Sequence, residues 1–204
     1  MLSKDDITAQ YSVFAEQMFW DGVSLPTEPI KGDLDLPETN TAGDTVTWTS
    51  GNPDILADDG TLVSQPAEDT EVVMTAEISG QKKEFTVTVA GLSSLLQEAA
   101  DALTIENADD VRGNLALVKE GENGTTINWT SGNTDVVTDE PMNEDSLYDG
   151  GEVTRPAAGE EAVKVTLTAE ISLNGQTTEK TFEVTVQPMP EDLDTDYTAG
   201  YLWT

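Results

Sequence analysis

A five-residue sequence, Trp-Thr-Ser-Gly-Asn, occurs twice in this chain, at residues 48–52 and 129–133. An identical repeat that contains tryptophan, with its copies 81 positions apart, indicates a duplicated folding unit. Before each turn, apolar residues alternate with threonine or asparagine, which is the pattern of a strand with one buried face. Because glycine and asparagine tolerate positive φ, the last residues of each copy predict a sharp turn.

Trp48 and Trp129 are predicted to point into a hydrophobic core. The residue two positions before each of them, Val46 or Ile127, is aliphatic and lies on the same face of a strand. A tryptophan buries about 150–250 Å², and its truncation to alanine typically costs about 3–5 kcal/mol. The alternative is an exposed indole that stacks on sugar rings, and the shared aliphatic face favours the core.

Further matches lie on both sides of the pentapeptides, and the distance between matching residues grows in steps along the chain. Growth confined to a few places is expected when a duplicated fold acquires longer loops. The largest step predicts a nine-residue insertion within residues 138–149, an acidic segment that contains Tyr148. The matches are Leu34 with Leu115, Gly60 with Gly150, Thr75–Ser79 with Thr168–Ser172, and Phe85 with Phe182.

The sequence predicts a mainly β chain of two tandem antiparallel β-sandwiches, each preceded by a short α-helix. Apolar residues at helical spacing predict these helices at residues 5–20 and from Leu92 to Leu103. We expect a first module at residues 1–90, a second at residues 91–188, and a linker with the start of a following domain at residues 189–204.

The first predicted helix carries an apolar face that runs from Ile7 to Met18. Aromatic residues are frequent in this helix and directly after it. They are expected to dock the helix on the first sandwich rather than to bind sugar. These residues are Tyr11, Phe14, Phe19 and Trp20.

The chain is strongly acidic, since its 204 residues include 40 Asp or Glu against 9 Lys or Arg, a formal net charge of −31. This charge disfavours nucleic acids and anionic membranes as partners. Cysteine and histidine are absent from the sequence, which excludes disulfides, thiolate or imidazole metal ligands and catalysis by either residue. The longest apolar runs are too short for a membrane span, so no membrane insertion is expected.

Carboxylates are so numerous that chance pairs are expected, and no catalytic or cofactor-binding residue is predicted. Glu77 and Glu170 occupy matching positions, but they alternate with apolar residues and are expected on a solvated strand face. The sequences Asp58-Asp59-Gly60 and Asp149-Gly150-Gly151 are predicted turns, with a calcium ion between acidic loops as an open alternative. Tyr148 is the candidate ligand contact, with a loop anchor as its other role.

Several longer stretches carry a resemblance to a known family. Residues 48–55 (Trp-Thr-Ser-Gly-Asn-Pro-Asp-Ile), 59–63 (Asp-Gly-Thr-Leu-Val) and 85–89 (Phe-Thr-Val-Thr-Val) resemble the bacterial immunoglobulin-like (Ig-like) repeats, above all their shortened, atrophied form. Residues 108–115 and 121–127 of the second copy are similar to the same family. The resemblance implies two tandem Ig-like sandwiches without catalytic residues. Such modules are attached as spacers to secreted polysaccharide-degrading enzymes.

Residues 191–204 resemble the entry into the five-bladed propeller of family 43 glycoside hydrolases, enzymes of arabinan and xylan breakdown. Together the two resemblances imply non-catalytic spacer modules of a larger carbohydrate-active protein, located outside the cell or on its surface. The expected partner is an adjacent catalytic domain, with polysaccharide as a second candidate. The alternatives are a carbohydrate-binding module, a cell-surface adhesion module, and an enzyme in its own right.

Overall fold

The computed structural model describes residues 14–141, 148 and 150–191. The chain divides into two compact units, Met1–Ser94 (unit 1) and Leu95–Thr204 (unit 2), and the division falls inside helix α2 (Leu92–Ala102). Short 3₁₀ helices follow in unit 2 at Ala108–Asp110 (η1) and Glu122–Gly124 (η2). No helix in the described part of the chain is long and apolar enough to cross a membrane.

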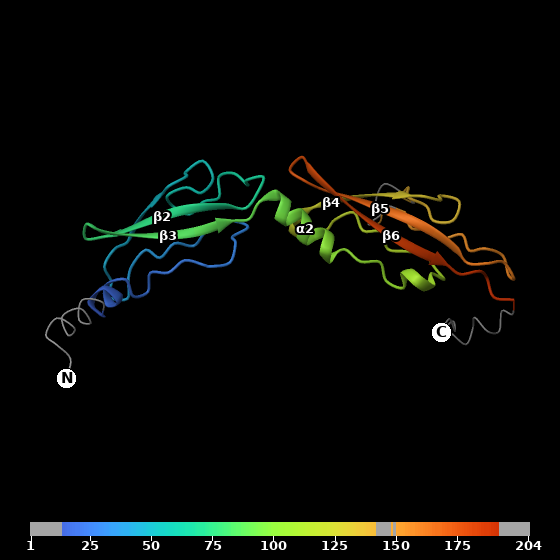
Figure 1. Cartoon of the computed structure of the whole chain (residues 1–204), viewed down its shortest axis with the longest axis horizontal. Helices are drawn as coiled ribbons and strands as arrows, with labels where there is room; N and C mark the ends of the chain where they lie inside the picture. Colours follow the sequence, from blue (N-terminus) through green and yellow to red (C-terminus); the bar gives the residue numbers. More distant parts are fainter. Residues whose placement is uncertain (1–13, 142–147, 149, 192–204) are drawn as a thin grey trace, which may run out of the picture. The chain divides into compact units, whose positions relative to one another are not determined.

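Each unit is built on one three-stranded antiparallel sheet (Figure 1). The two sheets have the same register, because Trp48 lies opposite Ala76 and Trp129 lies opposite Ala169. The chain is therefore mainly β, with two Ig-like units, as the sequence predicted. The strand order is β1 (Thr47–Ser50), β2 (Thr70–Ile78), β3 (Gln81–Val89) in unit 1, and β4 (Thr126–Ser131), β5 (Val163–Leu173), β6 (Gln176–Val186) in unit 2.

The segments that pack over each sheet are irregular. They contain single backbone bridges, such as those of Leu56 with Leu62 and of Val137 with Val153. Leu34 and Leu36 alternate with acidic residues, a pattern typical of a strand, but Leu34 is buried in an extended segment that lacks regular strand pairing. The alternation of apolar residues thus predicted the burial of Leu34 correctly. The segment does not form a regular strand, because the short turn at residues 57–61, on which it lies, is not long enough to be its partner in a sheet.

The core of unit 2 joins alternate residues of its sheet to one face of α2 and to the irregular segments. Leu96, Ala99 and Leu103 pack in this cluster with Trp129. Lys180 on β6 donates to two carbonyls at the end of α2, those of Ala100 at 2.6 Å and Leu103 at 2.9 Å. A cation at the C-terminus of a helix satisfies unpaired carbonyls and suits the helix dipole, so β6 fixes where α2 ends.

The buried face at the start of unit 1 differs from the prediction. Residues 14–19 are helical, but Phe14 is 58% exposed and Met18 is 60% exposed, whereas Trp20 is only 6% exposed. The contact with the sheet is made by the residues that end the helix, since Lys83 Nζ lies 5.7 Å from the centre of the Trp20 ring. The prediction that Phe14 docks this helix was therefore wrong, and Tyr11 lies outside the described residues.

Hydrogen bonds also correct the match of Gly60 with Gly150. The carbonyl of Gly60 accepts from Leu34 N at 2.8 Å, and that of Gly151 accepts from Leu115 N at 2.8 Å. Gly151 is thus the counterpart of Gly60, and the insertion is one residue longer than predicted. Gly150 and Gly151 are adjacent, and either could match Gly60 in the sequence. Only their hydrogen bonds distinguish them.

Candidate functional site

The two repeated tryptophans pack within their own units and make the same hydrogen bond. Trp129 is 5% exposed, and Trp48 is half-buried against the core of unit 1. Trp48 Nε1 donates to the carbonyl of Pro37 and Trp129 Nε1 donates to that of Val118, each at 2.9 Å. Each indole N–H is therefore satisfied by the chain itself, and Trp129 offers no open face for stacking on a sugar.

The turn after each tryptophan is held by a carboxylate. Asp58 Oδ1 accepts from Ser50 N at 2.7 Å, and Ser50 Oγ accepts from Asn52 N at 3.1 Å. A carboxylate that accepts a backbone N–H makes a strong, charge-assisted bond, so these acids have a structural role. Unit 2 has the equivalent bonds. Asp139 Oδ2 accepts from Ser131 N at 2.8 Å, and Ser131 Oγ accepts from Asn133 N at 3.2 Å.

Asp139 was not singled out from the sequence. The signal was present, since 81 positions separate Asp58 from Asp139 and the same distance separates the two tryptophans. Neighbouring Asp59 also serves its turn, because its Oδ1 accepts from Thr61 N at 3.0 Å. That backbone bond holds the pKa of Asp59 below its ordinary value.

The described residues contain no group of three or more acidic side chains arranged to hold a metal ion. Asp149, part of one predicted acidic turn, lies outside them. Glu77 pairs with Lys82 at 3.4 Å, and the Glu77 side chain is 42% exposed. Glu170 is exposed and lies opposite Glu179 on β6. Both glutamates therefore lie on open strand surfaces, without the enclosing cleft that glycoside hydrolysis requires.

Tyr148 lies in the insertion of unit 2 and is 43% exposed. Its backbone bridges to Val118, whose carbonyl accepts the Trp129 bond. The backbone of Tyr148 is thus tied to the segment beside Trp129, and a ligand contact by its partly exposed side chain stays a prediction. It borders a hollow of about 260 Å³, smaller than typical ligand pockets. The other lining residues are Asn114, Leu115, Ala116, Gly150, Gly151 and Glu152.

A larger hollow of about 410 Å³ opens between the end of α2 and residues 118–122. Its walls combine apolar groups such as Ala99 and Leu103 with the acids Glu120 and Glu122. It lacks an aromatic wall and a basic group among these residues. The arrangement therefore presents no recognisable subsite for a sugar or an anion.

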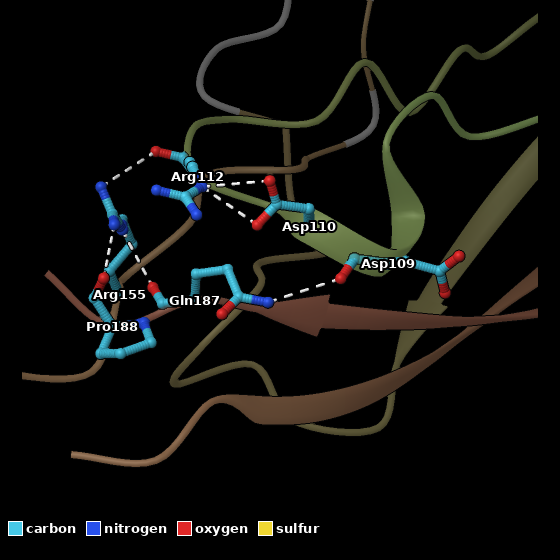
Figure 2. A network of polar contacts seen from close by, with 6 residues as sticks. All are labelled: Asp109, Asp110, Arg112, Arg155, Gln187 and Pro188. Carbon is cyan, nitrogen blue, oxygen red and sulfur yellow. Dashed lines mark hydrogen bonds and ion pairs between the residues drawn. The ribbon is translucent and has the colours of Figure 1, made fainter. Parts of the chain in front are cut away.

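Arg155 organises a polar network where β6 ends (Figure 2). Its Nε donates to the carbonyl of Gln187 at 2.9 Å, its Nη2 donates to that of Pro188, and its Nη1 donates to that of Arg112 at 3.4 Å. Arg112 in turn pairs with Asp110 at 3.0 Å. One guanidinium thus ties three backbone carbonyls together, a contact that sequence reasoning missed.

Unit 1 places Gln65 at the position of Arg155. Its side-chain amide donates to the carbonyl of Ala90, the residue directly after β3. The same loop also holds the start of α2, since Asp69 Oδ1 accepts from Gly91 N at 2.7 Å. Both units therefore use one loop to fix the chain where it leaves the last strand.

Comparisons with known proteins agree with the duplicated architecture. Residues 25–92 and 96–189 both match the model of the atrophied bacterial Ig domain. An alpha-L-arabinofuranosidase of Bifidobacterium longum subsp. longum is 35% identical over 161 residues, which cover 70% of this chain and 15% of the relative. The chain therefore spans only a small part of that protein's length.

Proposed function

Because the chain belongs to the atrophied bacterial Ig domain family, we propose that its units are non-catalytic structural modules of a larger carbohydrate-active protein. One observation carries this proposal. In both units, the polar groups around the repeated pentapeptide bond to the unit's own backbone, as the Trp129 indole and the Asp139 carboxylate do. Polar residues that make the same internal bonds in both units stabilise the fold, and this role suits a spacer better than a reactive centre.

The proposed parent is a glycoside hydrolase that acts outside the cell or on its surface. The arabinofuranosidase relative, of which the matched part is 15%, supports this choice. Sequencing the reading frame on both sides of the segment for this chain tests it directly. We expect a glycoside hydrolase catalytic domain and a secretory signal. A frame without a carbohydrate-active domain would contradict the proposal.

The alternative of a carbohydrate-binding module rests on Tyr148 and the hollow beside it. The test is a pull-down of the purified chain on insoluble arabinan and on insoluble xylan, with Tyr148→Ala as the matched variant. The spacer proposal expects both proteins to stay in the supernatant. Retention that Tyr148→Ala abolishes would establish a binding module instead.

A further inference from the structure

The segment that enters each unit pairs in parallel with the end of the unit's last strand. In unit 1, Ile30 N donates to Thr88 O and the carbonyl of Ile30 accepts from Ala90 N, both at 2.9 Å. Both units make two such bonds, with the same lengths and at matching positions, which indicates that the pairing belongs to the module. In unit 2, Val111 N donates to Thr185 O and Val111 O accepts from Gln187 N, both at 2.9 Å.

The direction of this pairing determines how it responds to force. Val111 and Val186 run in the same direction, with Val111 toward the start of unit 2 and Val186 at the end of β6. Tension on the two ends of the chain pulls Val111 toward the N-terminus and Val186 toward the C-terminus. The two paired segments are then pulled in opposite directions along their length. The bonds between them are therefore sheared together rather than opened one at a time.

Arg155 makes further bonds beside this pairing in unit 2 (Figure 2). It donates to Arg112 O on the entering segment and to the carbonyls of Gln187 and Pro188 on the leaving segment. Gln187 Nε2 adds a bond to Asp109 O at 3.4 Å, again between the two segments. A sliding motion of one segment past the other must break these side-chain bonds along with the backbone pair.

Unit 1 has a weaker version of this reinforcement. Gln65 replaces Arg155 and donates to Ala90 O. A glutamine side chain has a single donor nitrogen, whereas a guanidinium presents five N–H donors on three nitrogens in a rigid plane. The side chain at this position can therefore hold more carbonyls in unit 2 than in unit 1.

We propose that the parallel pairings are mechanical clamps, which let each unit hold tension between its ends, and that Arg155 makes the clamp of unit 2 the stronger one. This deepens the proposed spacer role, because a spacer between an enzyme and an immobile substrate or cell surface is pulled at both ends. The pulling measurement below needs neither the parent enzyme nor a polysaccharide. Its failure is therefore distinguishable from failure of the proposed function.

The test is single-molecule pulling of the whole chain through cysteines added at its two ends, which are unique handles because the sequence has no cysteine. The extension gained on unfolding identifies each unit, since residues 111–187 form a longer segment than residues 30–90. We expect unit 2 to unfold at a higher force than unit 1. Arg155→Gln should lower the unit 2 force to about that of unit 1 and leave the unit 1 event unchanged.

Two controls separate a clamp from a general loss of stability. Arg112→Gln removes a nearby exposed contact with Asp110 and should leave both forces unchanged. Handles at Asn128→Cys and Thr177→Cys pull β4 away from β6 across β5, so Arg155→Gln should have no effect in that direction. If Arg155→Gln fails to fold, Arg155→Lys keeps the charge with one donor nitrogen and should lower the force between the ends.

Three results would overturn the proposal. The first is a unit 2 that unfolds at the same force as unit 1 or at a lower one. The second is an unchanged force between the chain ends in Arg155→Gln, or in Arg155→Lys if that variant replaces it. The third is an equal loss of force in both pulling directions, which would show that Arg155 acts on stability alone.

Discussion

The residue that best illustrates the fold is the repeated tryptophan. Trp129 combines near-complete burial with a hydrogen bond from Nε1 to the carbonyl of Val118, and Trp48 makes the matching bond to Pro37. A polar group that loses its hydrogen-bond partner where water cannot replace it costs about 1–3 kcal/mol. The indole thus contributes through both its apolar area and its N–H, and the two contributions can be separated by substitution.

Trp129→Phe is expected to lower the free energy of unfolding of unit 2 by about 1–3 kcal/mol, because the Val118 carbonyl loses its donor and the smaller ring leaves a gap. Trp48→Phe should cost less, since Trp48 is half-buried and water can reach its site. Urea unfolding followed by circular dichroism measures both. Equal losses in the two variants would contradict the burial difference.

At the scale of an element, the turns depend on glycine in two different ways. Gly151 has φ of +89°, and a Cβ at this position would lie 2.2 Å from Leu115 O. Gly175 in the β5–β6 turn has a similar φ of +84°, with no atom within 4 Å of such a Cβ. The two glycines therefore separate backbone strain from close packing.

Gly175→Ala is expected to destabilise unit 2 by about 1–2 kcal/mol, the cost of a left-handed conformation for an alanine. Gly151→Ala should cost about 1–3 kcal/mol more, because the backbone of Leu115 must move as well. Thermal unfolding of the two variants measures the difference. A Gly151→Ala chain as stable as Gly175→Ala would show that residues 115 and 151 are not in close contact.

The start of α2 gives unit 1 a pH dependence. The bond from Gly91 N and a second bond from the Ser94 side chain hold the pKa of Asp69 below its ordinary value of 3.8. The unfolded chain therefore takes up this proton first as the pH falls, and the stabilisation from Asp69 is lost as the pH drops through its folded pKa. The contribution is fully present at pH values above the ordinary pKa.

Asp69→Asn should therefore lower the Tm of unit 1 more at about pH 6 than at about pH 2.5, because the stabilisation from the Asp69 carboxylate is lost as the pH falls through its folded pKa, which lies below the ordinary value of 3.8. The measurement is the Tm difference between the wild-type chain and the variant at each pH. Because the other acidic residues titrate in both proteins, their effects largely cancel. A Tm difference that stays constant between the two pH values would refute this role of Asp69.

The sequence predicted the sheets better than the segments that cover them. Alternation in the runs that end at Trp48 and Val89 correctly identifies regular strands, because both runs pair with the nine-residue strand β2 in the same unit. The Arg155 network escaped prediction, because its acceptors are backbone carbonyls and carbonyls leave no trace in side-chain patterns. The prediction that Phe14 docks the first helix was wrong for a related reason. Helical spacing indicates an apolar face but does not show which part of the protein covers that face.

At the scale of the whole molecule, charge is the dominant property. A net charge of −31 on 204 residues implies strong self-repulsion in the compact state. Repulsion of this kind keeps chains apart in solution and destabilises each fold. Salt should therefore affect stability more through screening of repulsion than through loss of the few exposed ion pairs, such as Lys164 with Glu183.

Raising NaCl from about 0.02 M to about 0.5 M should increase the Tm of the chain, because the shorter Debye length screens the repulsion between its negative charges. Lys164→Gln, which removes one exposed ion pair, should change this salt response little. Differential scanning calorimetry at the two salt concentrations gives the answer. A Tm that falls with salt would mean that attractive pairs outweigh the excess of negative charge.

We propose that these two units complete their own folds and have no catalytic activity. The most direct measurement incubates the purified chain with arabinan, arabinoxylan and an aryl α-L-arabinofuranoside, and quantifies released sugar and aryl alcohol against a heat-inactivated sample. We expect no release above that background from any of the three. Turnover of any one of them that persists through further purification would contradict it.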